Sequence, residues 1–264
     1  LGGYIRGLAI GPDGSIYASE WDQRAIFKYS PDGTQLAVVQ TPARSYGMVT
    51  NGTDLWFVQR GNGGNGTLYR IDTTQIVDDS IGENNVNTAA LHGPFIQSWS
   101  GSRNAGYGIA IDGKGRVWVG THPLRDLYAI RFDPSDNTWA AIPNTDCLAF
   151  SGVGRGVTVS TTGGSNDVVW VAQHGGSLEG DCSDSNSGSP RARLTGFNTD
   201  TLAIVNDRDL SSLCHIPIGV GIGESGNVWS VCRDTPENGS LARAGSIVGI
   251  NPAPGNLATN TNQA

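Results

Sequence analysis

The feature that most constrains the fold is a short unit that occurs five times along the chain. Each copy starts with an apolar run around a glycine, passes through a polar turn, and continues into a second apolar run with an aromatic residue in its middle. In the third copy these parts are residues 108–111, 112–115 and 117–119. Alternating apolar residues bounded by Gly and Asp predict half-buried antiparallel strands joined by hairpins. The repeated unit therefore predicts an all-β protein.

The spacing of the five copies predicts how these strands are arranged. Neighbouring first-run glycines are 40 to 63 residues apart, and repeats of about 40–50 residues with four strands each are typical of β-propeller blades. We predict a single β-propeller domain over residues 1–264, either five-bladed or part of a six- to seven-bladed ring. The first-run glycines are Gly7, Gly47, Gly108, Gly156 and Gly219. The repeats fall at approximately residues 4–40, 44–100, 105–145, 153–210 and 216–258.

The charge balance and the distribution of apolar residues argue against two classes of partner. Seventeen Lys and Arg stand against 24 Asp and Glu, which gives a formal net charge of −7. Nucleic-acid binding relies on a basic surface, so we expect no nucleic-acid partner. No run of 18 apolar residues occurs, so we also expect no membrane span.

The four cysteines occupy equivalent places in the fourth and fifth repeats. Cys147 and Cys214 precede the first strands of these repeats, whereas Cys182 and Cys232 lie at the ends of the second strands or beyond them. In a propeller blade these segments open on the same face, so the repeats predict disulfides Cys147–Cys182 and Cys214–Cys232. A structural zinc site and free buried thiols are the alternatives. Disulfides form in oxidising compartments, which predicts an extracellular, periplasmic or cell-surface location.

The same register places polar side chains at one end of the predicted channel. Arg, Tyr and His recur there although blade turns do not need them, which indicates a polar ligand site; hydrogen bonding between neighbouring blades is the alternative. We expect an anionic or hydroxyl-rich ligand, such as a glycan or a peptide. The candidate ligand-binding residues are Arg6, Tyr46, Arg60, Tyr107, Arg155 and Arg233. At the ends of the second strands the register predicts two sets of equivalent residues. The first set is Glu20, Gln59, Thr121, Gln173 and Cys232. The second set, one residue further along, is Trp21, Arg60, His122, His174 and Arg233.

The recurring unit resembles the blades of virginiamycin B lyase (streptogramin lyase) and of the related NHL-type propellers. The resemblance covers all five repeats and is clearest in residues 14–21, which look like the lyase segment with a Trp-Phe-Thr-Glu-type sequence. It implies a β-propeller, and in the lyases a metal ion and histidines at the channel mouth open a cyclic depsipeptide by elimination. Those enzymes carry Pro-His directly before an inner strand, a pattern that this chain does not match.

The peptide-amidating lyase is also similar in architecture, with a disulfide placed much like Cys214–Cys232 and a zinc ion held by three histidines. This resemblance implies a metal-dependent lyase as the alternative function. His122 and His174 are then the candidate catalytic residues and metal ligands, and Glu20 is the candidate carboxylate for general acid/base catalysis. We expect a binding or scaffold module rather than an enzyme, and a place within a larger extracellular protein is a further hypothesis.

The cofactor stays open at this stage. A divalent metal at the two histidines is one possibility, and structural calcium is the other. Residues 184–188 imitate the start of a calcium loop, although Thr195 stands where such a loop ends in Glu.

Overall fold

The computed structural model is an all-β protein, which confirms the predicted fold class. Its five antiparallel sheets are the five blades of a β-propeller, and each blade corresponds to one predicted repeat. The structure describes residues 3–42, 44–59, 67–78, 106–121, 127–143, 153–161, 167–174, 192–210, 213–214, 216–233 and 246–251. In these ranges no helix has the length and apolar character needed to cross a membrane.

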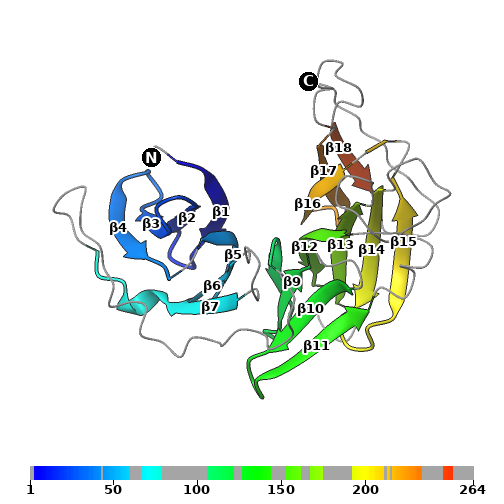
Figure 1. Cartoon of the computed structure of the whole chain (residues 1–264), viewed down its shortest axis with the longest axis horizontal. Helices are drawn as coiled ribbons and strands as arrows, with labels where there is room; N and C mark the ends of the chain where they lie inside the picture. The colour runs from blue at the N-terminus through cyan, green and yellow to red at the C-terminus, as the bar shows by residue number, and fades with distance from the viewer. Residues whose placement is uncertain are drawn as a thin grey trace. The chain divides into compact units, whose positions relative to one another are not determined.

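The strands of each sheet follow one another in sequence order (Figure 1). The first sheet consists of β1 (Ile5–Ile10), β2 (Ile16–Glu20), β3 (Ala25–Tyr29) and β4 (Gln35–Gln40). The second consists of β5 (Ser45–Asn51), β6 (Asp54–Gln59) and β7 (Thr67–Asp72), followed by the short 3-10 helix η1 (Thr73–Gln75). The third consists of β8 (Ile109–Ile111), β9 (Val117–Gly120), β10 (Leu127–Asp133) and β11 (Thr138–Pro143). The fourth consists of β12 (Val153–Ser160), β13 (Val168–His174), β14 (Ala192–Asn198) and β15 (Ile204–Asp209). The fifth consists of β16 (Ile216–Ile222), β17 (Val228–Arg233) and β18 (Ser246–Ile250).

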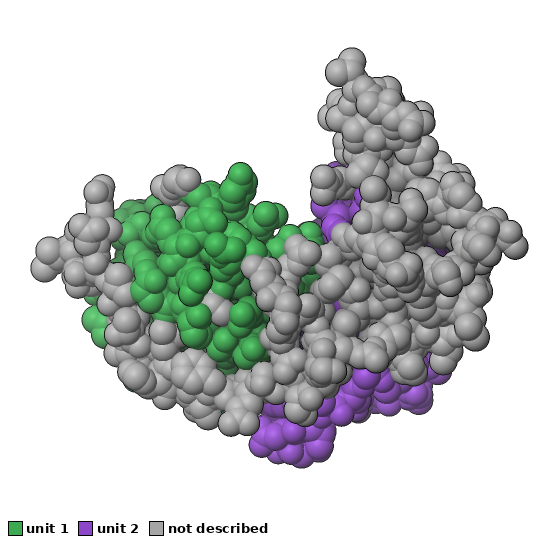
Figure 2. Space-filling view, in the orientation of Figure 1, with its two compact units in different colours: residues 1–109 green, residues 110–264 purple. Residues whose placement is uncertain are grey.

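The chain divides into two compact units, residues 1–109 and residues 110–264 (Figure 2). The first unit holds the first two sheets, and the second holds β9 to β18. That the whole chain forms one domain stays a prediction.

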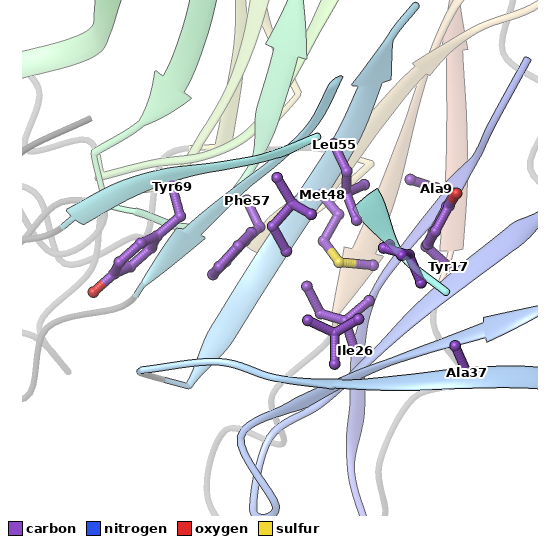
Figure 3. Packing of buried hydrophobic residues seen from close by; sticks show 11 residues of the cluster. Ala9, Tyr17, Ile26, Ala37, Met48, Leu55, Phe57 and Tyr69 are labelled. Carbon is purple, nitrogen blue, oxygen red and sulfur yellow. The ribbon is translucent and has the colours of Figure 1, made fainter. Parts of the chain in front are cut away.

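The core of the first unit lies between the first two sheets. Tyr17 and Ile26 from the first sheet pack in one cluster with Met48, Leu55 and Phe57 from the second (Figure 3). All five side chains are buried, and full burial of a side chain of this size contributes about 1.5–3 kcal/mol. Neither sheet covers its own apolar face, so each depends on its neighbour for stability.

The second unit repeats this arrangement twice. One cluster joins Trp118 of the third sheet to Val169 and Phe197 of the fourth. A second cluster joins Trp170 of the fourth sheet to Val248 of the fifth. The aromatic residue of the repeated unit is therefore a core residue in both sheets, since Trp118 and Trp170 are buried.

The repeated glycine permits close packing between the first strands of neighbouring blades. A Cβ atom at Gly7 would lie 2.8 Å from the backbone oxygen of Tyr46, and one at Gly47 would lie 2.5 Å from that of Tyr107. In the second unit, a Cβ at Gly156 would lie 2.8 Å from the backbone nitrogen of Val220. These distances are shorter than real Cβ atoms show. At these three positions a larger residue would separate adjacent strands, whereas a Cβ at Gly219 would make only ordinary contact, at 3.8 Å from Val231 Cβ.

A buried carboxylate fixes the first hairpin of the third blade. Asp112 accepts hydrogen bonds from the backbone N–H groups of Lys114 and Arg116, both at 3.0 Å. It also accepts from Arg116 Nε at 2.7 Å and from Trp118 Nε1 at 3.0 Å. The polar turn is thereby bonded to the buried tryptophan of the next strand, and Gly115 closes the turn with a φ of 80°, a conformation that favours glycine.

Candidate functional site

A β-bulge marks the residue before the repeat glycine in four of the described first strands. The pairing shifts between Ile5 and Gly7 in β1 and between Ser45 and Met48 in β5. It shifts likewise between Gly154 and Val157 in β12 and between Pro217 and Gly219 in β16. A bulge interrupts the ladder and re-aims side chains, and bulges are common beside binding sites. The bulged positions include the predicted register residues Arg6, Tyr46, Arg155 and Ile218.

Strand pairing also places four residues at the ends of the second strands at equivalent positions, namely Glu20, Gln59, Gln173 and Cys232. Ile5 pairs with Glu20, Ser45 with Gln59, Gly154 with Gln173 and Pro217 with Cys232. Each pair lies directly beside the bulge. The register deduced from sequence therefore describes the ends of these strands correctly.

In the first unit, three of the predicted residues form one group with a tryptophan. The rings of Tyr46 and Tyr107 lie 4.1 Å apart between centroids, and Trp21 meets Tyr46 edge-on at 5.4 Å. The guanidinium of Arg6 lies 5.3 Å from the centroid of Tyr46 and 5.7 Å from that of Trp21. Arg6 Nη1 also donates to the hydroxyl of Tyr46 at 3.4 Å. Arg6, Tyr46 and Tyr107, which the sequence made equivalent by register, thus lie near one another, and their role in binding a ligand stays a prediction.

Two further residues of this group were missed from the sequence. Tyr4 has its ring centroid 5.5 Å from Arg6 Cζ, and Arg44 Cζ lies 5.3 Å from the centroid of Trp21. Both residues stand two positions before a register residue, and alternate residues of an extended chain share a face. That spacing was the signal available in the sequence. We call the whole group the arginine–aromatic cluster: Tyr4, Arg6, Trp21, Arg44, Tyr46 and Tyr107.

The positive charge of the cluster is only weakly compensated. Arg6 is exposed and makes no ion pair with a described carboxylate. Arg44 Nη2 lies 4.0 Å from Asp22 Oδ1, and both side chains are substantially exposed. Exposed ion pairs contribute about 0–1 kcal/mol, and each cation–π contact at an exposed site contributes about 0.5–1 kcal/mol. Aromatic rings therefore hold both guanidinium groups while leaving their charge available to a ligand.

Three buried polar atoms at the same strand ends have no hydrogen-bond partner among the described residues. They are Oε1 of Glu20, Nε of Arg44 and Oγ of Ser45. Buried polar groups are nearly always hydrogen-bonded to protein, water or a ligand. Their grouping at the ends of β2 and β5 marks this as a polar part of the first unit.

Glu20, the predicted acid/base residue, is fully buried at the end of β2. Its Oε2 accepts a hydrogen bond from the backbone N–H of Gln23, which fixes the turn into β3. A Cβ atom at Gly3 would overlap this carboxylate, so the chain before β1 passes directly over it. The geometry gives Glu20 a positional role in the turn; its catalytic role stays a prediction.

In the second unit, Arg155 is buried on the bulge of β12. A Cβ atom at Gly120 would overlap its backbone oxygen, so β9 and β12 approach each other closely at this point. A ligand-binding role of Arg155 stays a prediction.

Several predicted site residues lie outside the described residues. These are Arg60, His122 and the calcium-like loop at 184–188, and, for their side chains, His174 and Arg233. Cys147 and Cys182 lie outside them as well. In the part of the chain that the structure describes, no group of three His, Cys, Asp or Glu side chains is arranged to hold a metal ion. The predicted metal sites are therefore untested.

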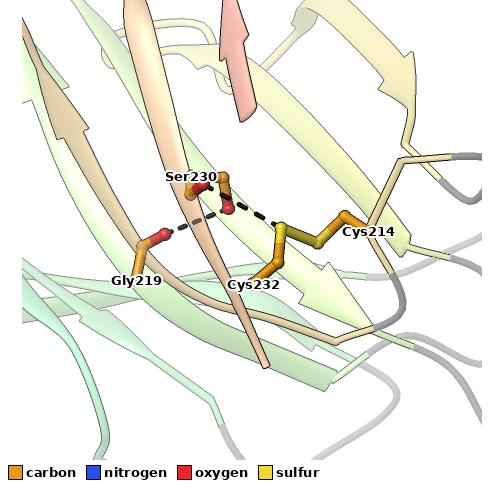
Figure 4. Close-up of a disulfide and its surroundings, with 4 residues drawn as sticks. All are labelled: Cys214, Gly219, Ser230 and Cys232. Atoms are coloured by element: carbon orange, nitrogen blue, oxygen red, sulfur yellow. Dashed lines mark hydrogen bonds between the residues drawn. A yellow bond between two sulfur atoms is a disulfide. The ribbon is translucent and has the colours of Figure 1, made fainter. Parts of the chain in front are cut away.

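One of the two predicted disulfides is present. Cys214 lies just before β16 and is bonded to Cys232 in β17 (Figure 4). Both residues are buried, and both belong to the cluster that joins the fourth and fifth sheets. The bond ties the entry of the first strand to the end of the second, as the repeat register predicted.

The comparisons with known proteins show the fold of this chain and no family to which it belongs. No protein-family model matches the sequence, and no curated protein is significantly similar to it. Among solved structures, Kuenenia stuttgartiensis hydrazine synthase has 13% identity and a TM-score of 0.62 over 92% of this chain. The chain spans 64% of the length of that protein. A nidogen/laminin complex has 12% identity and a TM-score of 0.61, with 98% of this chain and 80% of that chain covered.

A streptogramin B lyase is also among the similar structures, with 15% identity and a TM-score of 0.49, over 98% of this chain and 83% of that chain. Similarity at these identities shows the fold alone, and a propeller fold serves many unrelated functions.

Proposed function

We propose that the chain is an extracellular β-propeller that works as a binding or scaffold module, and that the arginine–aromatic cluster holds its polar ligand. The observation that carries this proposal is the state of Arg6. Its guanidinium lies within 5.7 Å of the ring centroids of Tyr4, Trp21 and Tyr46, and no described carboxylate neutralises it. Charge held in this way suits an anionic or hydroxyl-rich ligand.

The disulfide supports the extracellular part of the proposal. Cys214 and Cys232 are bonded, and structural disulfides persist in oxidising compartments. A place within a larger extracellular protein, and membership of the NHL-type propellers, belong to the same proposal. Detection of the protein in a secreted or periplasmic fraction, with this disulfide intact, would test the location.

The ligand site can be tested by calorimetric titration of the purified protein with peptides and with neutral and acidic oligosaccharides. We expect a ligand from this panel to bind the wild type and to lose most of its affinity for Trp21→Ala, because that change removes the ring shared by Arg6 and Arg44. Equal binding to wild type and to Trp21→Ala would refute the site. The metal-dependent lyase stays a prediction from sequence, since His122 and the side chain of His174 are not described.

A further inference from the structure

We infer that the ligand of the arginine–aromatic cluster is an oligosaccharide that carries carboxylate groups, an inference that rests on the proposed function. The cluster combines two chemistries that such a molecule needs. A guanidinium recognises a carboxylate, and aromatic faces recognise the apolar face of a sugar ring. Each is carried by described side chains of the first unit.

The carboxylate is assigned to Arg6. A guanidinium has five N–H donors in a planar fork that matches a carboxylate through two parallel bonds. Arg6 uses one long hydrogen bond, to the hydroxyl of Tyr46 at 3.4 Å, and its side chain is exposed. Its other donors make no hydrogen bond to a described residue, and three rings around the side chain restrict its position. A guanidinium that is already oriented loses less entropy when it binds.

The sugar ring is assigned to the aromatic side chains beside Arg6. Tyr4 is 67% exposed, and Trp21 and Tyr107 are half-buried, so their ring surfaces are partly open to solvent. Aromatic faces are electron-rich and attract the weakly positive C–H groups on one face of a pyranose. Aromatic contacts and the carboxylate contact can thus be made by one acidic sugar.

Two other anionic ligands fit the site less well. A peptide C-terminus is usually captured by free backbone N–H groups, whereas here the N–H of Gly7 donates to Ser19 Oγ at 2.9 Å and that of Trp21 to the oxygen of Tyr4 at 3.0 Å. A long polyanion with several charges per residue would be repelled at long range by the net charge of −7 more strongly than a short oligosaccharide. A sugar with one carboxylate per residue at short range to Arg6 avoids both difficulties.

The test compares each acidic oligosaccharide with its own methyl ester, because esterification removes the charge and leaves the sugar ring unchanged. The probes are a tetramer of galacturonate and a hyaluronan tetrasaccharide, titrated into the full chain by calorimetry. We expect at least one acid to bind about tenfold or more tightly than its ester. Arg6→Gln should abolish this preference, and Arg6→Lys, which keeps the charge but loses the planar fork, should retain part of it.

Arg24→Gln is the matched control. Arg24 is exposed and lies on the same unit, and no hydrogen bond, ion pair or cation–π contact joins its side chain to a described residue of the cluster, so its loss changes the net charge equally. The acid preference should survive in this variant, and thermal melting should confirm that each variant is folded. If acid and ester bind equally and both are lost with Trp21→Ala, the inference is overturned and the proposed function stands. If peptides bind at Trp21 while both acids fail, the result is the same. If no probe binds, or if Arg24→Gln acts like Arg6→Gln, both are overturned.

Discussion

Replacement of Gly47 by alanine tests whether close approach between blades explains the repeat glycine. The new methyl group would lie 2.5 Å from the backbone oxygen of Tyr107 and 3.1 Å from Cγ2 of Ile109. Ordinary contact begins at 3.4 Å, so the two first strands would have to separate by about 1 Å. A backbone oxygen cannot rotate away as a side chain can. The strain therefore falls on the packing between β5 and residues 107–109.

The magnitude follows from two opposing effects. Overpacking of this kind costs about 1–3 kcal/mol, whereas Gly→Ala restricts the unfolded chain and returns about 0.4–1 kcal/mol. We expect a net loss of about 1–2 kcal/mol, which lowers the melting temperature by about 2–8 °C for a chain of this size. The Tyr46–Tyr107 contact flanks the substituted residue, so ligand binding should weaken as well.

The assay is urea unfolding followed by tryptophan fluorescence, together with a thermal melt. The control is Gly221→Ala, because Gly221 also lies in a first strand but a Cβ there meets nothing within 4 Å. This variant should be as stable as the wild type or gain about 0.4–1 kcal/mol. If the two variants unfold together, or if Gly47→Ala matches the wild type, close approach is not the reason for the repeated glycine.

Three further outcomes are expected. Asp112→Asn should destabilise the second unit by about 1.5–3 kcal/mol in urea unfolding, because the buried acceptor of the Arg116 and Trp118 hydrogen bonds loses its charge while Arg116 keeps its ion pair with Asp200; a loss under about 1 kcal/mol would show that the hydrogen bonds suffice without the charge. Reduction of the Cys214–Cys232 disulfide, whose cysteines are 18 residues apart, should lower the free energy of unfolding by about 3 kcal/mol. A variant with both Cys214→Ser and Cys232→Ser has no such bond, so the reductant should not produce this loss in it. Burial raises the pKa of Tyr17 and of Tyr69 above the usual value, so the stability that their neutral forms contribute is present below about pH 10 and is lost as pH rises through the higher folded-state pKa. The free energy of unfolding, measured over a pH series, should fall at alkaline pH, and Tyr17→Phe should make it fall less steeply with pH.

The sequence predicted the fold well because the residues that pack between blades, the repeat glycine and the aromatic residue of the second strand, recur in a short local pattern. The apolar runs 108–111 and 117–119 of the third copy correspond to β8 and β9, which differ from them only at their ends. The outer strand β15 left no such pattern, because its side chains are mostly exposed or half-buried, with Ile204 and Val205 beside Asp and Arg. An outer strand has one paired neighbour and little core to fill. Period-two alternation weakens where burial does.

The candidate site could be predicted only in part, because register and three-dimensional contact are different kinds of information. The repeats identified Arg6, Tyr46 and Tyr107 as equivalent, and the structure brings them together. Tyr4 and Arg44 belong to the same cluster but lie outside the repeated unit. Contacts made by side chains that flank a strand depend on how neighbouring blades are juxtaposed, which no single repeat encodes.

One structural feature links the fold to the site. Close blade packing requires the repeat glycine, and the ladder is bulged next to it in four of the described first strands. The preceding residue is thereby released from regular pairing, so the ladder does not constrain its side chain, whether that side chain is exposed as in Arg6 or buried as in Tyr46 and Arg155. This explains why that position carries Arg6, Tyr46, Arg155 and Ile218 in successive bulges while the glycine beside it does not change. That side chains at this position bind a ligand is the proposal that the Trp21→Ala and Arg6→Gln titrations test.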